Sequence, residues 1–118
     1  MCNLINSEVT EAQYHLLFPN MTININPGFP NLSIDTWRSD GPLRTLGMSE
    51  QYFAPGVDPR FAEELVAFNA QVGEEDDILT SSVQRGLNAG IPERGRFLTE
   101  AEKLMGEFQK LVATAVAG

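Results

Sequence analysis

Hydrophobic and polar residues alternate along the first half of the chain, and this pattern predicts short β-strands. The segment 13–18 is apolar and aromatic, and in 21–26 aliphatic residues then occupy every second position. A similar alternation covers 31–38, and a fourth strand is expected over 44–53. Asn26-Pro27-Gly28 and the Gly41-Pro42 turn separate these segments. Short strands joined by such turns predict an antiparallel meander with an aliphatic core face and a wetter face.

In the second half, hydrophobic residues recur every three or four positions, which is the period of an α-helix. Asp58-Pro59 is typical of a helix start, with the aspartate as N-cap. The helix then carries one apolar stripe: Phe61, Leu65, Phe68 and Val72. We expect Gly73 to interrupt or bend it, and an acidic helix to follow over 74–87. Gly90 suits a left-handed cap at the end of that helix.

The last segment predicts a third helix. Thr99-Glu100-Ala101-Glu102 has the form of a capping box. One face of the helix is then apolar: Leu104, Phe108, Leu111 and Ala115. We expect this face to lie against a sheet. Strands followed by helices indicate an α+β fold, with an antiparallel sheet packed on a long C-terminal helix. This is a partial helix-grip arrangement of the START/Bet v 1 type.

A carboxylate occurs at an unexpected place in the acidic helix. Its apolar stripe is Leu79, Val83 and Leu87, and the same face extends back to Asp76. A buried carboxylate is costly unless it is paired, hydrogen-bonded or bound to a cation. Asp76 can be a first-turn acid that the helix dipole favours, or it can bind a metal or act on a substrate. Asp77 falls on the polar side of this helix.

Composition excludes several kinds of site. A net charge of −8 and a pI near 4.5 disfavour nucleic acid and anionic membranes as partners. The single cysteine, Cys2, permits no disulfide within the chain. With His15 as the single histidine, 118 residues cannot supply the usual zinc site or a complete site of two histidines and one carboxylate. No membrane-spanning run or signal peptide is apparent, so we expect a cytoplasmic protein.

Four motifs, in this order, resemble the Rieske-type non-haem iron oxygenases. They are Leu17-Phe18-Pro19-Asn20 before an alternating strand, Gly41-Pro42 in a hairpin, Glu75-Asp76, and Ser82-Val83-Gln84-Arg85-Gly86-Leu87. The resemblance is to the C-terminal part of the catalytic domain of the large (alpha) subunit. It extends over about 14–111 of the chain.

The resemblance implies an oxidoreductase that activates O2 at a mononuclear Fe(II). The reaction is hydroxylation of an aromatic ring, as in aromatic hydrocarbon catabolism by a dioxygenase, or oxidative demethylation of an amine. Electrons come from a reductase or ferredoxin through a Rieske 2Fe-2S cluster, and the alpha subunits form a homo-trimer. The family's carboxylate ligand corresponds to Asp76, the residue that the helical pattern directs inward.

The resemblance also suggests a mostly apolar substrate pocket. Candidate lining residues are Phe18, Asn20 and Trp37 from the sheet and Leu79 from the helix. Core packing or turn hydrogen bonding explains each of these four residues equally well. We assign no catalytic residue beyond the iron ligand, and we interpret His15 as a pocket or interior residue.

The motifs of the family that bind the Rieske cluster and supply the two iron-binding histidines do not occur in residues 1–118. We therefore expect a C-terminal fragment of the catalytic domain, inactive in isolation. The alternative is a non-catalytic helix-grip module that binds a hydrophobic small molecule, and a third interpretation is a degenerate reading frame. An inward Asp76 separates the first two, since a carrier of apolar molecules has little use for an acid there.

Overall fold

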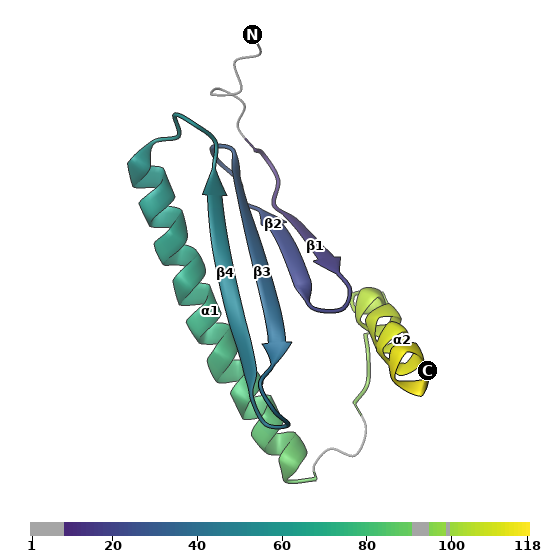
Figure 1. Cartoon of the computed structure of the whole chain (residues 1–118). Helices are drawn as coiled ribbons and strands as arrows, with labels where there is room; N and C mark the ends of the chain where they lie inside the picture. The colour runs from purple at the N-terminus through teal and green to yellow at the C-terminus, as the bar shows by residue number, and fades with distance from the viewer. Residues whose placement is uncertain (1–8, 91–94, 99) are drawn as a thin grey trace. The chain divides into compact units, whose positions relative to one another are not determined.

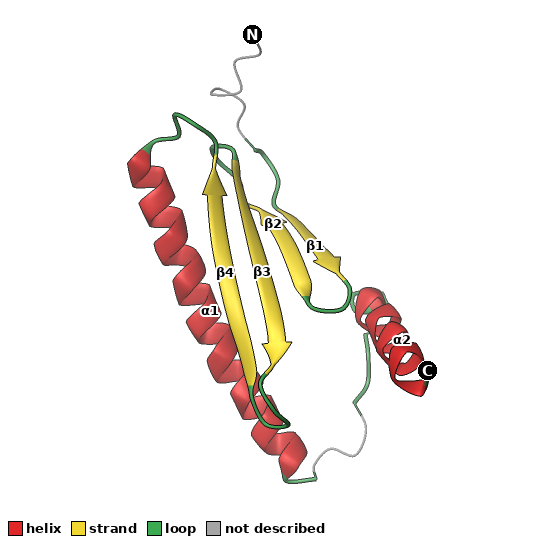
Figure 2. Ribbon diagram, viewed as in Figure 1, coloured by secondary structure: helices red, strands yellow, loops and turns green. Residues whose placement is uncertain are grey.

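The computed structural model describes residues 9–90, 95–98 and 100–118. Four strands come first and two helices follow, where the sequence predicted four strands and three helices (Figures 1 and 2). The elements are β1 (Gln13–Leu17), β2 (Met21–Ile25), β3 (Asn31–Ser39), β4 (Thr45–Phe53), α1 (Pro59–Asn88) and α2 (Lys103–Ala117). The chain divides into two units, Met1–Asn69 and Ala70–Gly118. Helix α1 contributes its first part to one unit and the remainder to the other.

The sheet is an antiparallel meander in the order β1-β2-β3-β4, which confirms the α+β interpretation. Ile23 of β2 pairs with His15 of β1 on one side and with Ile34 of β3 on the other. The β3–β4 pairing is the longest and runs from Asn31 opposite Phe53 to Ser39 opposite Thr45. The predicted strand boundaries are within one residue of those observed.

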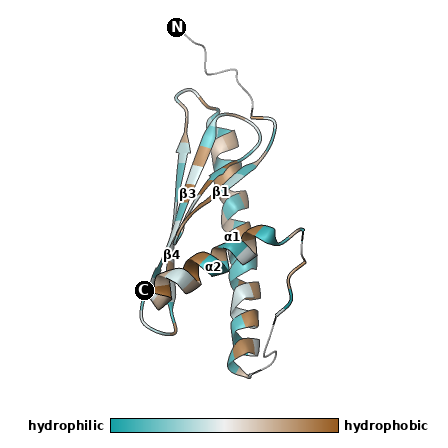
Figure 3. Ribbon diagram, turned by 90° about the vertical axis from the view of Figure 1, so that its right-hand side faces the viewer, coloured by the Kyte–Doolittle hydropathy of each residue, from teal (hydrophilic) through white to brown (hydrophobic). Residues whose placement is uncertain are grey.

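The register separates the sheet into two faces because successive side chains of a strand point to opposite sides. We call one the polar face; its central members are Thr22, Asn24, Ser33, Asp35, Trp37, Ser49, Gln51 and Phe53. We call the other the aliphatic face; it carries Leu17, Met21, Ile23, Ile25, Leu32, Ile34, Leu46 and Met48. The hydropathy colours show hydrophobic and hydrophilic stretches mixed along the elements (Figure 3).

The first part of α1 lies against the polar face. The rings of Phe61 and Phe53 meet edge to face at 6.5 Å, and the Asn69 amide donates to Gln51 Oε1 at 3.0 Å. Leu65 lies one helical turn after Phe61 and one turn before Asn69, and it is half-buried. The covered stripe therefore ends in the polar Asn69, whereas Phe68, predicted to belong to the apolar stripe, is 59% exposed.

This arrangement corrects the prediction that the aliphatic side is the core face. No aliphatic side chain of the described residues is buried, and the one buried residue among them is Ser33 on the polar face, at 3% exposure. The alternation in the sequence identified the two faces correctly. It could not tell which face the helix covers, because polar groups are accepted under a helix when they hydrogen-bond to one another.

The loop before β3 holds the beginning of α1 in place. Gly28 has a φ of 116°, and a Cβ on it would approach the Phe61 ring to 2.6 Å. Phe29 packs edge to face on the same ring at a centroid distance of 5.2 Å. Asn31 closes the loop because its side chain bonds to both the amide and the carbonyl of Asn26. A glycine is thus required here both for its left-handed backbone and for its lack of a side chain.

Helix α1 is continuous through Gly73, where the sequence predicted a break. A single glycine within a helix costs about 1 kcal/mol relative to alanine, which the hydrogen bonds of a long helix tolerate. The predicted ends are confirmed. Asp58 Oδ1 accepts from the Arg60 amide at 2.9 Å as an N-cap, and Gly90 has the left-handed φ of 78°.

Helix α2 begins at Lys103, after the predicted capping box. Thr99, its first residue, lies outside the described residues. The Glu102 carboxylate does reach back, but it accepts from the Leu98 amide at 2.7 Å, one residue before the predicted partner. The packing of α2 against a sheet stays a prediction. No helix in the described part of the chain combines the length and apolar character needed to cross a membrane.

Candidate functional site

Asp76 lies in the middle of α1, because the helix does not restart after Gly73. The dipole of a helix acts within its first and last turns. A favourable place in a first turn therefore does not explain this acid, and that interpretation of Asp76 is wrong. The Asp76 side chain is exposed, and its carbonyl accepts the Thr80 hydroxyl at 2.8 Å.

Asp76 also continues the line of residues that contact the sheet from the first part of α1. Phe61, Leu65 and Asn69 succeed one another at intervals of four, and Asp76 follows Asn69 by seven. Seven residues are about two turns of an α-helix, so the two side chains project from nearly the same side of the helix. A continuous helix thus links the register of Asp76 to that of a side chain with an observed sheet contact.

The neighbouring acids differ from Asp76 in register and in bonding. The Glu75 carboxylate accepts from the Gln71 amide at 2.9 Å, an exposed i,i+4 bond on the helix surface. Asp77 lies about 100° further round the helix than Asp76, and its carbonyl makes the longer contact, 3.3 Å, to the Thr80 hydroxyl. The chain therefore offers a matched pair of adjacent aspartates at different helical positions.

The sheet residues proposed for the pocket gather near the β1–β2 turn. The Asn20 amide donates to the Trp37 carbonyl at 2.6 Å, and the Trp37 amide donates to the Asn20 carbonyl at 3.0 Å. Asn20 thereby ties the turn to β3. Phe18 begins the turn at a cis peptide bond to Pro19 and is 41% exposed. Leu79 in the other unit is 63% exposed. Their role as pocket lining stays a prediction.

A hydrogen-bonded cluster on the polar face was not among the sequence-based candidates. The Asn24 amide donates to Asp35 Oδ2 at 2.7 Å. The same nitrogen lies 3.3 Å from both Thr22 Oγ1 and Ser33 Oγ, and the Thr22 hydroxyl lies 3.2 Å from Asp35 Oδ2. Aspartate is disfavoured in the middle of a strand, so Asp35 could have been singled out from the sequence. The polar residues of two consecutive alternating segments fall on the same side once the strands pair.

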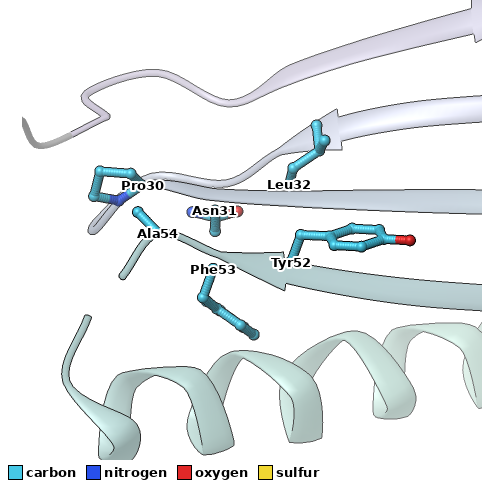
Figure 4. A pocket seen from close by; sticks show the side chains of 6 residues that line it. All are labelled: Pro30, Asn31, Leu32, Tyr52, Phe53 and Ala54. Atoms are coloured by element: carbon cyan, nitrogen blue, oxygen red, sulfur yellow. The ribbon is translucent and has the colours of Figure 1, made fainter. Parts of the chain in front are cut away.

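Figure 4 shows the residues that line a shallow hollow at the Asn31–Phe53 end of the β3–β4 pair. The volume of this hollow is about 300 Å3. Its lining residues are Pro30, Asn31, Leu32, Tyr52, Phe53 and Ala54. None of the four sequence-based pocket candidates belongs to this lining. The hollow is mostly apolar and open to solvent, and it brings together no acid and base that could act on a bound molecule.

The described residues do not by themselves fit a complete metal site. Within 9–90, 95–98 and 100–118 no three His, Cys, Asp or Glu side chains converge to hold a metal ion. His15 lies on β1, on the same side as the aliphatic face, at 3.5 Å from Gln13 Oε1. Cys2 lies outside the described residues. A Rieske cluster likewise finds no ligand set in a chain with one cysteine and one histidine.

Comparison with known proteins gives one family. Residues 3–118 match the family model described as the ring hydroxylating alpha subunit (catalytic domain). Searches of curated proteins and of solved structures gave no significant match. The family match extends over nearly the whole chain, including the strands, both helices and the acidic pair at Glu75-Asp76. The chain therefore belongs to the ring-hydroxylating alpha subunits, within the catalytic domain of an oxygenase's large subunit.

Proposed function

We propose that the chain is the C-terminal part of the catalytic domain of a Rieske oxygenase that hydroxylates an aromatic ring or oxidatively demethylates an amine. The family match over 3–118 is the observation that carries this proposal. The two histidine ligands of the mononuclear iron and the Rieske domain come, in this proposal, from parts of the subunit outside these 118 residues. The cellular location is the cytoplasm.

Asp76 is the residue that we assign to the iron. Its position on the line of Phe61, Leu65 and Asn69 supports this role, because an acid there has no explanation from the helix dipole. A carboxylate offsets part of the charge of a divalent cation and can ligate through one or two oxygens. Asp77, about 100° away, is directed differently and serves as the natural control.

Iron held by two histidines from elsewhere in the subunit and by Asp76 would supply the site at which oxygen is activated. The chain's own contribution is to present the carboxylate from a continuous helix and to cover the substrate. Phe18, Asn20, Trp37 and Leu79 are the residues we propose for that cover. A reductase or ferredoxin supplies electrons, and the alpha subunits associate as a homo-trimer.

The assignment of Asp76 is tested in the complete subunit by exchanging each aspartate for alanine. We expect Asp76→Ala to abolish iron binding and oxygen consumption while the circular dichroism spectrum is unchanged. We expect Asp77→Ala to retain both, because its side chain lies about 100° further round the helix. Retention of iron by the first variant and loss by the second would show that the register is wrong.

A non-catalytic helix-grip carrier is the competing function. The same purified proteins distinguish it from the oxygenase. A carrier binds an apolar dye with the same affinity whether Asp76 or Asp77 is replaced, and it copurifies with no iron. Copurified iron that depends on Asp76 supports the oxygenase instead.

A further inference from the structure

We propose that the polar face of the sheet binds a cationic nitrogen of the substrate, using the carboxylate of Asp35 and the indole of Trp37. This inference rests on the proposed oxygenase function and selects, of its two substrate classes, the amine. A positively charged amine carried into the space beside the sheet would meet the only carboxylate that the described strands place on the polar face.

Asp35 is a half-buried acid that forms no ion pair with any of the described residues. Its Oδ2 accepts both the Asn24 amide and the Thr22 hydroxyl. These neutral donors fix the orientation of the carboxylate, and among the described residues Oδ1 has no hydrogen-bond partner. No Lys or Arg of the described strands lies on the polar face; Arg38 of β3 points to the opposite side. A carboxylate held this way favours a cation that can approach its second oxygen.

Trp37 stands beside that carboxylate on the same strand. Residues two apart in a strand point to the same face, about 6.6 Å apart along the chain. The indole packs over Gly47 of β4, where a Cβ would be 3.4 Å from its ring atoms, and 42% of the residue remains exposed. Glycine thus gives the ring a flat backbone surface to rest on. A cation within about 6 Å of an indole face is attracted by the ring quadrupole.

The two groups together select charge as well as shape. A neutral aromatic ring would stack on Trp37 but would gain nothing from Asp35, and its contact would displace water from the acid. An alkylated ammonium group is attracted by both the acid and the indole. The net charge of −8 adds a general attraction for cations. The local pair, not the overall charge, decides where the cation binds.

Choline and its neutral isostere 3,3-dimethylbutan-1-ol provide the test, since they share shape and differ in charge. We expect the full 118-residue chain, titrated with each by isothermal calorimetry or NMR, to bind choline more tightly. Asp35→Asn should weaken choline binding about tenfold, a change of ~1.4 kcal/mol, and leave the isostere unaffected. Trp37→Leu should weaken choline binding roughly two- to fivefold, as expected for a partly exposed cation–π contact.

Glu50→Gln is the matched control. It removes one negative charge from the opposite side of the sheet and should leave choline binding unchanged. Equal affinity for choline and the isostere, or an equal loss in Glu50→Gln and Asp35→Asn, would overturn the inference. If Asp35→Asn alters the circular dichroism spectrum, the comparison of choline with the isostere on Trp37→Leu still decides. The titrations need no iron, so failure here leaves the Asp76 assignment standing, and loss of iron binding leaves these titrations valid.

Discussion

The two faces of the sheet differ in a way that reverses the usual expectation. The polar face carries a hydrogen-bonded cluster, contacts α1 through Gln51 and contains the buried Ser33. The aliphatic face has no buried side chain, and Met48 on it is 58% exposed. Hydrophobicity alone therefore does not identify the face of this sheet that the helix covers. Polar groups lie where the first part of α1 meets the sheet, whereas none of the aliphatic side chains is buried.

The largest effect should follow from the exposed aliphatic face. We expect the isolated chain to self-associate and to bind an apolar dye, because unmatched apolar surface favours association. Met48→Lys places a charge on that surface, in β4, and should shift the chain toward monomer in analytical ultracentrifugation. Ser49→Lys, on the neighbouring polar face, should not. A wild-type chain that melts cooperatively as a clean monomer would show that the aliphatic face needs no further cover.

Breaking the polar cluster should have the next largest effect. Asn24→Ala removes the donor that Asp35 and Ser33 share, so the buried Ser33 hydroxyl loses this partner and Asp35 Oδ2 keeps only the Thr22 hydroxyl. We expect a loss of about 1–3 kcal/mol in the free energy of unfolding by urea. Thr45→Ala changes an exposed residue of β4 on the same face of the sheet, and it should alter the free energy of unfolding little. Equal effects in the two variants would mean that the cluster contributes no special stability.

The hydrogen bond between α1 and the sheet should contribute less to the free energy of unfolding than the polar cluster does. Asn69→Ala removes the hydrogen bond to Gln51, and we expect a destabilisation of about 0.5–1.5 kcal/mol. Gln71→Ala removes an exposed bond to Glu75 within the helix and serves as a control with a smaller expected cost. A Gln71 effect as large as that of Asn69 would argue that α1 is held by its own helical bonds and not by the polar face.

The smallest effect concerns a tyrosine on the same side as the aliphatic face. A hydrogen bond to Glu50, together with the negative charge of that carboxylate, raises the pKa of Tyr52 above its usual value. Deprotonation would place two negative charges side by side, so this contribution to stability is present below the ordinary tyrosine pKa of about 10 and is lost as the pH rises beyond the raised value. Ultraviolet titration should show a late component that Tyr52→Phe removes and Glu50→Gln moves to lower pH. An unchanged titration in Glu50→Gln would contradict this cause.

Local chemistry explains how much of the fold the sequence could predict. The strands, the Asp58 cap and the Gly90 terminator follow from alternation and capping residues, and all are observed. The break at Gly73 was wrongly predicted, because helical hydrogen bonds outweigh the cost of one glycine. The polar cluster was missed because it forms only when β2 pairs with β3, a contact that no local pattern specifies. The proposed role of Asp76 comes from helical spacing and family resemblance, and one histidine in the chain cannot supply the two histidine ligands of the iron.

The most direct test of the account is to locate iron by anomalous X-ray diffraction in crystals of the complete subunit. We predict that the anomalous peak lies against the carboxylate of Asp76, with two histidines completing the protein ligands, and that the peak disappears in Asp76→Ala. A peak that persists in this variant, or one bound by Asp77 instead, would contradict the assignment of Asp76 as the iron ligand of this oxygenase.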